Sequence, residues 1–526
     1  MHFETLENKL DDHQKNEIEA YRELRSRLDS TDPYRPTYHF TPPGGIVHDP
    51  NGASYWNGRY HLFYQFRPPG LDESVPWERA MHWGHAVSED LVHWQDLPIA
   101  LAPETGPEYS CYSGQALVEH DRVVLMYHGP GAGNCIAISD DPLLINFEKH
   151  TENPVVPLTD DDEYTVFDPD IWAEDGTYYS LSGTQRGERF GDGVPTAHLF
   201  RSEDLLDWEY TGPFLETGEF TAPGEDAAVP NFVEFDERDL LLCFSHHRGP
   251  HYYLGVYDRE TGAFEPERHG RMTHGPATHS DGIGGLGLGT LHAPSVLSGP
   301  EGRQIAFFNV IDGKPQEGWS QIVALPRVLE VDERGRLTVE APSELETLRN
   351  DSTTVSPRSI SNEEIVVAPD AGRAIEIEAT LDPDTASVVG LSVLRSNDST
   401  ESTTISYYER SDTLELDTTR STTRTDVPTR PGEQAPLALD AKEPLRVRVY
   451  VDRSVVEAFA NGRRCLTARV YPEMTSTGLS VFARRGIAEL KSLTVHDLAA
   501  IWSDGQPTDG KPNGDGLEES DGSAQA

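Results

Sequence analysis

A motif that occurs twice constrains the fold of this chain more than any other feature. The pattern Ser-Glu-Asp-Leu-x-x-Trp covers residues 88–94 and 202–208, and a looser copy begins at Ser139. The period is therefore about 50–60 residues, which in a chain of short strands and turns predicts four-stranded propeller blades. The alternative, two unrelated tryptophan-bearing turns, leaves the match at five of seven positions unexplained.

The sequence on either side of these repeats changes character. A polar helix is expected over about residues 7–28, because Asp32-Pro33 stops it. A stretch rich in Ser and Thr predicts a linker, and the strict apolar–polar alternation beyond it, as in Ile375-Glu376-Ile377-Glu378, predicts a β-sandwich. The final residues are rich in Gly, Asp, Ser and Pro, which is typical of a disordered tail.

The predicted fold class is all-β: a five-bladed β-propeller followed by a β-sandwich, with a short N-terminal helix. A chain of 526 residues is long enough for two or three domains. The expected parts are an N-terminal helical extension (1–34), the propeller as catalytic domain (35–349), a linker (350–362), the β-sandwich (363–502) and a disordered acidic tail (503–526).

The charge of the chain excludes several classes of partner. Asp and Glu number 89 against 43 Lys and Arg, for a formal net charge of −46. Such a surface repels nucleic acid and anionic membranes, so neither is an expected partner. We interpret the charge as an adaptation to a high-salt cytoplasm, where screening shortens self-repulsion to about 3 Å at 1 M salt. A polyacidic surface that binds cations is the alternative.

The N-terminus has no basic segment followed by an apolar one, and no run approaches the roughly 18 apolar residues of a membrane span. We therefore expect a cytoplasmic protein. The four cysteines are far apart without metal-ligand spacing, which predicts buried free thiols. The histidines also lack metal-ligand spacing, so we expect no catalytic metal, and nothing in the sequence calls for a cofactor.

One stretch holds a carboxylate in a fixed orientation. Pro50 restricts Asp49 to an extended conformation, and Asn51-Gly52 is a tight-turn signal before the strand expected over residues 60–65. A catalytic carboxylate needs such rigid placement. The alternative is an Asx-type turn without chemistry, because the dipeptide Asp-Pro occurs five times in the chain.

Further carboxylates could meet Asp49, because a propeller brings the inner strand of each blade to one central channel. Asp168, again in an Asp-Pro pair before a strand, is the second candidate, and Glu225 or Asp226 is the third. Glycoside hydrolysis needs a nucleophile or base together with a proton donor of raised pKa, and acidic side chains near aromatics and glycines suit it. These residues alone do not separate such a site from a Ca²⁺ site.

Several segments resemble those of glycoside hydrolase family 32, the invertases, levanases, inulinases and other β-fructosidases. They are residues 35–43, His48-Asp49-Pro50-Asn51-Gly52, Phe63-Tyr64-Gln65, 83–86, 91–98, Tyr112-Ser113-Gly114, 292–295, 318–327 and 451–459. The resemblance covers about residues 35–502. It implies a five-bladed propeller with an appended β-sandwich, and a double displacement that retains configuration.

The resemblance also implies roles for individual residues. Asp49 corresponds to the family's nucleophile, and Asp168 to the carboxylate that stabilises the transition state. Gln65 corresponds to a residue that contacts both sugar and nucleophile, and Ser113 to one that contacts sugar. The residues expected to bind substrate are His48, Asn51, Gln65, Trp83, His85, Ser113, Asp226 and His292.

Three positions depart from the family pattern. His48 stands where the family usually has Asn, and Phe167 replaces the Arg of its Arg-Asp-Pro motif. Ala228 replaces the Glu that serves as acid/base in its Glu-Cys-Pro motif. Glu225 is the first substitute for that acid/base, because Glu is longer and easier to keep protonated, and Asp226 is the second.

The expected substrate is a small carbohydrate, sucrose or a short fructan. Three alternatives stay open at this point: a related furanosidase with a changed sugar preference, suggested by Phe167; a carbohydrate-binding protein without catalysis, suggested by Ala228; and a fructosyltransferase. A homo-oligomer formed through the β-sandwich is also open.

Overall fold

The computed structural model describes most of the chain. The described residues are 9–71, 75–76, 79–104, 107–159, 164–183, 197–215, 218, 220–221, 226–236, 238–246, 248–275, 291–311, 313–314, 316–427 and 431–502. Glu225 and the tail expected at 503–526 lie outside them.

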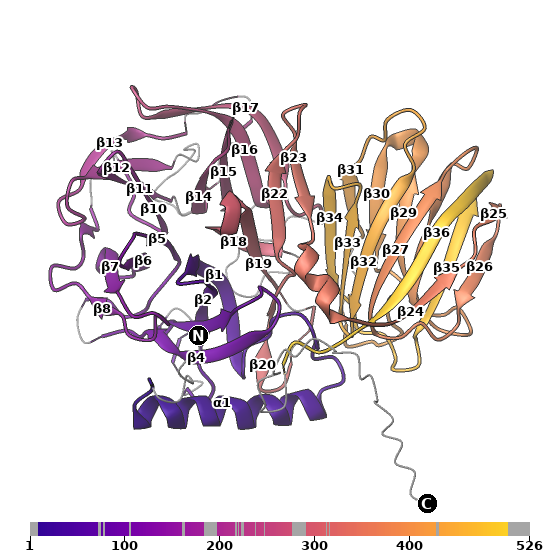
Figure 1. Ribbon diagram of the computed structural model, residues 1–526, viewed down its shortest axis with the longest axis horizontal. Helices are drawn as coiled ribbons and strands as arrows, with labels where there is room; N and C mark the ends of the chain where they lie inside the picture. Colours follow the sequence, from indigo (N-terminus) through magenta and orange to yellow (C-terminus); the bar gives the residue numbers. More distant parts are fainter. Residues whose placement is uncertain are drawn as a thin grey trace, which may run out of the picture.

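Five sheets surround a common centre and form the first domain, as Figure 1 shows. The first blade has strands β1 (Gly45–Trp56), β2 (Arg59–Arg67), β3 (His82–Ser88) and β4 (Trp94–Leu101). The second has β5 (Gly114–Val118), β6 (Val123–Gly129), β7 (Gly133–Ser139), β8 (Glu148–Lys149) and β9 (Val156–Pro157). The third has β10 (Pro169–Glu174), β11 (Thr177–Ser182), β12 (His198–Ser202) and β13 (Glu209–Pro213).

The fourth blade has β14 (Ala228–Glu234), β15 (Asp239–Ser245), β16 (Gly249–Asp258) and β17 (Ala263–Arg271). The fifth has β18 (Leu291–Ser298), β19 (Gln304–Val310), β21 (Ile322–Val323), β22 (Arg327–Val331) and β23 (Leu337–Glu340). The first strand of each blade is innermost, and β1, β5, β10, β14 and β18 contact one another in turn around the centre. The predicted five-bladed propeller is confirmed.

A short parallel pairing closes the ring. Strand β20 (Trp319–Ser320) follows β19 of the fifth blade in sequence but joins the sheet of the first, where Gly45 pairs with Trp319 and Ile46 with Ser320. The last blade is thereby tied to the first residues of β1. This fixes the inner end of β1 against its neighbours.

The sequence repeat corresponds to one turn used in the first and third blades, between the third and fourth strands. Asp90 Oδ1 accepts hydrogen bonds from the backbone N–H of Val92 at 3.1 Å and of His93 at 2.8 Å. Asp204 Oδ1 accepts the equivalent bonds from residues 206 and 207 at 2.9 and 3.0 Å. The intervening Leu91 and Leu205 have φ of 68° and 73°. The Ser-Glu-Asp-Leu signature therefore marks an Asp-stabilised turn.

The single long helix among the described residues lies along the outside of the propeller (Figure 1). Helix α1 (Asp12–Thr31) begins at a capping box made by Asp11 and Gln14. Its buried Arg25 forms a bidentate ion pair with Asp96 of β4 and stacks 3.4 Å above the ring of Trp502. The helix thus ties the first blade to the last described residue of the chain.

Two sheets pack face to face as the predicted β-sandwich. The first has β24 (Arg349–Val355), β25 (Arg358–Ser361), β27 (Ala374–Asp382), β32 (Leu445–Asp452), β33 (Val455–Ala460), β34 (Arg464–Arg469) and β36 (Ile487–Leu498). The second has β26 (Glu364–Ala368), β28 (Val388–Arg395), β29 (Thr403–Tyr408), β30 (Thr413–Asp417), β31 (Glu433–Pro436) and β35 (Gly478–Arg484). Alternate residues such as Ile375 and Ile377 enter its core.

The stretch 350–362, expected to be a linker, is part of the sandwich. Strands β24 and β25 both pair antiparallel with β36, so these Ser- and Thr-rich residues form the edge of the first sheet. The prediction was wrong because β-branched Thr suits an exposed edge strand as well as it suits a loop. Residues 350–354 are exposed, which explains their polar composition.

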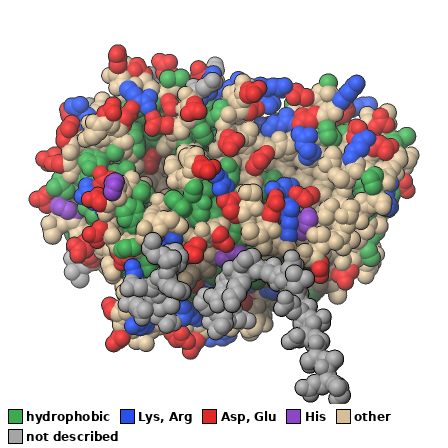
Figure 2. Space-filling model, viewed as in Figure 1, with side chains coloured by type: hydrophobic (Ala, Val, Ile, Leu, Met, Phe, Trp, Pro, Cys, Tyr) green, Lys and Arg blue, Asp and Glu red, His purple; other side chains and the backbone are tan. Residues whose placement is uncertain are grey.

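The surface carries many acidic side chains, and Figure 2 shows them over both domains. All four cysteines are buried and free, as expected. In the described part of the chain, no helix is long and apolar enough to cross a membrane.

One buried carboxylate joins the two domains. Asp452, at the end of β32, accepts hydrogen bonds from the backbone N–H groups of Thr37, Tyr38 and His39 at 2.8–2.9 Å. It also contacts His39 Nδ1 at 3.0 Å, and both side chains are fully buried. The segment that leads into β1 is therefore held on the sandwich.

We expect Asp452→Ala to lower the free energy of unfolding by about 3 kcal/mol or more, because several buried donors lose their acceptor. Chemical denaturation of the full chain measures this. Asp440→Ala is the matched control, since Asp440 is 59% exposed in its pair with Arg334, and it should cause a much smaller change. Equal effects of the two variants would contradict a structural role for Asp452.

Candidate active site

Asp49 lies where β1 departs from regular pairing. The register of β1 against β2 shifts between Val47 and Pro50 and again between Asn51 and Ser54, and Gly52 has φ of 49°. Bulges of this kind turn a side chain out of the regular alternation. The Asp-Pro and Asn-Gly signals are thus the local cause of the orientation of Asp49.

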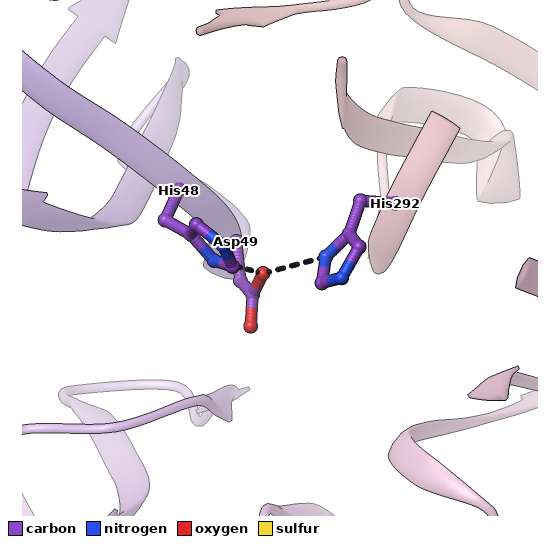
Figure 3. A group of neighbouring side chains, drawn as sticks. All are labelled: His48, Asp49 and His292. Carbon is purple, nitrogen blue, oxygen red and sulfur yellow. Dashed lines mark hydrogen bonds and ion pairs between the residues drawn. The ribbon is translucent and has the colours of Figure 1, made fainter. Parts of the chain in front are cut away.

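Side chains from three blades converge on the carboxylate of Asp49. Ser113, just before β5, donates to Oδ2 at 2.7 Å. Gln65 of β2 donates to Ser113 Oγ at 2.7 Å and lies 3.4 Å from the same Oδ2. On the other oxygen, Nδ1 of His48 lies 2.6 Å and Nδ1 of His292, from β18, lies 3.1 Å from Oδ1 (Figure 3).

These contacts keep Asp49 ionised. Burial alone would raise its pKa, but the charge and hydrogen bonds of His48 and His292 outweigh burial and hold the pKa well below its ordinary value. Burial lowers the pKa of His292 to about 4 despite the opposing effect of Asp49. At neutral pH the structure therefore presents a carboxylate beside a neutral imidazole.

The pKa of Asp168 is shifted in the opposite direction from that of Asp49. It precedes β10, is 4% exposed, and its pKa is raised well above the ordinary value by burial and then by the negative charge of Asp49. A hydrogen bond from the backbone N–H of Val229 partly opposes this. Two carboxyl groups that influence one another and have pKa values shifted in opposite directions are typical of a hydrolytic site.

Val229 supplies its N–H from a strained backbone. Its φ is 47°, which is unfavourable for a β-branched residue, and Asn231 Nδ2 bonds to its carbonyl oxygen at 3.0 Å. Sequence reasoning did not identify this residue as functional. The only signal was its place before Pro230 in a segment already compared with a family motif.

Asp226 lies beside the site in a pair with His246. It is 2% exposed and accepts a hydrogen bond from the backbone N–H of His246 at 2.9 Å and a second, very short one from Nδ1 of the same ring. The ring of His246 lies 6.4 Å from that of His292. Asp226 is therefore connected to Asp49 through two histidines, whereas Glu225 lies outside the described residues.

The two apolar departures from the family pattern lie together. Ala228, Val229, Phe244 and Ala293 form one buried cluster, and Phe167 packs against it. Phe167 also lies 4.9 Å from the ring of His128. The site thus has an apolar wall beside Asp168.

Three residues expected to bind substrate are instead buried in the blades. Trp83 is completely buried against Tyr127 and donates Nε1–H to the carbonyl oxygen of residue 112 at 2.8 Å. His85 lies 3.0 Å from His61 and stacks on Phe63 at 4.2 Å. Asn51, also completely buried, lies 3.4 Å from the N–H of residue 114. Their side chains face packed neighbours, and their role in substrate binding stays a prediction.

Both His48 and His292 contact Asp49. The two histidines lie far apart in the sequence and do not have the spacing of a metal-ligand motif. The donor atoms of these three residues all lie within 4.8 Å of one another. These residues lie close together because the propeller ring closes between the fifth and first blades. Their positions in the sequence alone do not predict this contact.

The paired carboxyl groups at the centre of a five-bladed propeller, with a β-sandwich behind it, define this protein as a glycoside hydrolase. The chain belongs to glycosyl hydrolases family 32: the family's N-terminal domain matches residues 39–342 and its C-terminal domain matches residues 344–497. The resemblance seen in the sequence is confirmed.

Relatives of known function match nearly the whole chain. A β-fructofuranosidase of Oryza sativa subsp. japonica (insoluble isoenzyme 6) is 30% identical, with 85% of this chain and 86% of the relative covered. The sucrose-6-phosphate hydrolase of Escherichia coli is 28% identical over 92% of this chain and 97% of its own. The crystal structure of fructan 1-exohydrolase IIa from Cichorium intybus superposes with a TM-score of 0.75 at 22% identity, covering 89% and 98% of the two chains.

Proposed function

We propose that this protein hydrolyses β-fructofuranosides, sucrose or short fructans, with retention of configuration. The observation that carries the proposal is the carboxylate of Asp49, held ionised by Ser113, His48 and His292 in the channel beside Asp168. The relatives named levanase, sucrose-6-phosphate hydrolase and β-fructofuranosidase support the substrate class.

In this mechanism Asp49 attacks the anomeric carbon of the fructosyl group and the bond to the leaving oxygen breaks. A proton donor in the segment Glu225-Asp226 protonates that oxygen, and the same group then takes a proton from water, which releases fructose and restores Asp49. Asp168 stabilises the positive charge that develops on the ring. Its repulsion by Asp49 disappears when Asp49 becomes neutral in the covalent intermediate.

We expect Asp49→Asn to lower kcat on sucrose by about a thousandfold or more, because the amide is a poor nucleophile. Released fructose and glucose are measured in high salt. Asp382→Asn is the matched control, since it changes the same Asp-Pro dipeptide in the sandwich, where Asp382 pairs with Lys491. Undiminished hydrolysis by Asp49→Asn would refute the assignment.

The proton donor is tested with Glu225→Gln and Asp226→Asn. We propose Glu225 as the donor, so Glu225→Gln should abolish sucrose hydrolysis yet keep activity on an aryl β-fructofuranoside, whose leaving group needs no protonation. The basic limb of the pH–rate profile should flatten at the same time. If only Asp226→Asn behaves in this way, Asp226 is the donor.

A related furanosidase with a changed sugar preference is the second candidate, and the wall formed by Phe167 and Ala228 favours it. An Arg at position 167 would hold sugar hydroxyls by charge-assisted hydrogen bonds, whereas Phe167 and Ala228 offer only apolar contact. A site that lacks such groups loses much of its preference for a substrate with hydroxyls there.

For this second candidate, the double variant Phe167→Arg/Ala228→Glu should raise kcat/KM on sucrose at least tenfold relative to other furanosides. The single variant Phe167→Arg should be worse than wild type, because it would bury an unpaired charge against the apolar cluster. Comparison of sucrose, levan, inulin and other furanosides measures the preference. An unchanged ranking in the double variant would show that this wall does not determine specificity.

The charge of the chain supports a further proposal, that the enzyme works in a halophile's cytoplasm. With a net charge of −46, self-repulsion should destabilise the folded chain unless salt screens it. Activity that is highest without added salt would contradict this.

Dimerisation through the sandwich is tested by sedimentation under the same conditions.

A further inference from the structure

The imidazoles of His48 and His292 both lie against one carboxylate oxygen of Asp49, as Figure 3 shows, and one donor atom of each of the three residues lies within 4.8 Å of the others. Nδ1 of His48 and Nδ1 of His292 approach the same Oδ1 of Asp49, at 2.6 and 3.1 Å. The other oxygen, Oδ2, is occupied by the hydrogen bond from Ser113. The set offers two nitrogen donors and one oxygen donor on one side of the carboxylate.

This donor set matches a divalent transition metal. Zinc in a tetrahedral site has ligands at about 2.0–2.1 Å, which places neighbouring ligand atoms about 3.3 Å apart. The His292 contact at 3.1 Å is close to that spacing, and the His48 contact at 2.6 Å would need to widen by about 0.7 Å. The side chains of His48 and His292 are 19% and 13% exposed, so the ion and a water ligand can enter from the channel.

We propose that His48, Asp49 and His292 form a binding site for a zinc ion that occupies the carboxylate of Asp49 and inhibits the enzyme. An imidazole binds a metal ion through Nδ1 only when the ring proton is on Nε2, so binding through these two nitrogens selects that tautomer. Inhibition is reversible, because a chelator removes the ion.

His48 makes this site particular to the chain. The family pattern has Asn at that position, and an amide cannot supply the second imidazole. Asn is also similar in size to the inner half of the His side chain, which makes His48→Asn a conservative change. The zinc site therefore depends on the first of the three departures found in the sequence.

Zinc binding is measured by equilibrium dialysis of the full chain against zinc chloride, and by the visible absorption of cobalt(II) in the same site. We expect one tight site that is lost, or weakened at least tenfold, in His48→Asn and in His292→Asn. The matched control is His120→Asn, which removes an exposed histidine between β5 and β6 and should leave that site intact. Circular dichroism verifies that each variant is folded.

If zinc affinity and cobalt absorption are the same in His48→Asn, His292→Asn and wild type, the proposal is wrong. The inhibition is tested separately on wild type, where zinc should compete with sucrose and EDTA should restore full activity. Inhibition that does not compete with sucrose would also overturn it. The inhibitory role rests on the proposed function, but binding does not, so a chain that binds zinc without hydrolysing sucrose refutes only the proposed function.

Discussion

The site depends on the closure of the propeller ring. Strand β20 pairs in parallel with the first two residues of β1, so the start of β1 lies beside the inner strands of the second and fifth blades. Only there can Ser113 and His292, which lie 64 and 243 residues from Asp49 in sequence, reach opposite oxygens of one carboxylate. The N–H donors that Asp452 binds belong to the segment leading into β1, so the sandwich supports the same strand from outside.

The closed ring sets the electrostatics of the channel. Burial alone would raise the pKa of both Asp49 and Asp168, yet only Asp49 has two imidazoles against it. Burial raises the pKa of Asp168, and the charge on Asp49 raises it further, because charges interact more strongly in a medium of low dielectric constant. The Asp49 carboxylate is therefore available as a nucleophile. The pKa of Asp168 changes when the charge on Asp49 changes.

The apolar wall changes what the channel can recognise. Phe167 and Ala228 replace an Arg and a Glu of the family pattern, and the structure places Phe167 against the cluster that contains Ala228. We propose that the proton donor comes from Glu225 or Asp226, and Asp226 itself is held beside the site by its pair with His246.

The sequence by itself determined the architecture and part of the site. The Ser-Glu-Asp-Leu repeat predicted the blades because it encodes one turn, and the Asp-Pro-Asn-Gly signal placed Asp49 because it encodes a local irregularity of β1. The tertiary structure decided which residues meet there. Trp83 and His85 pack in the blades although alternation alone allowed them to face the channel, and strands β24 and β25 pair with β36. Period-two patterns give the two faces of a strand, but ring closure decides which face is buried between blades.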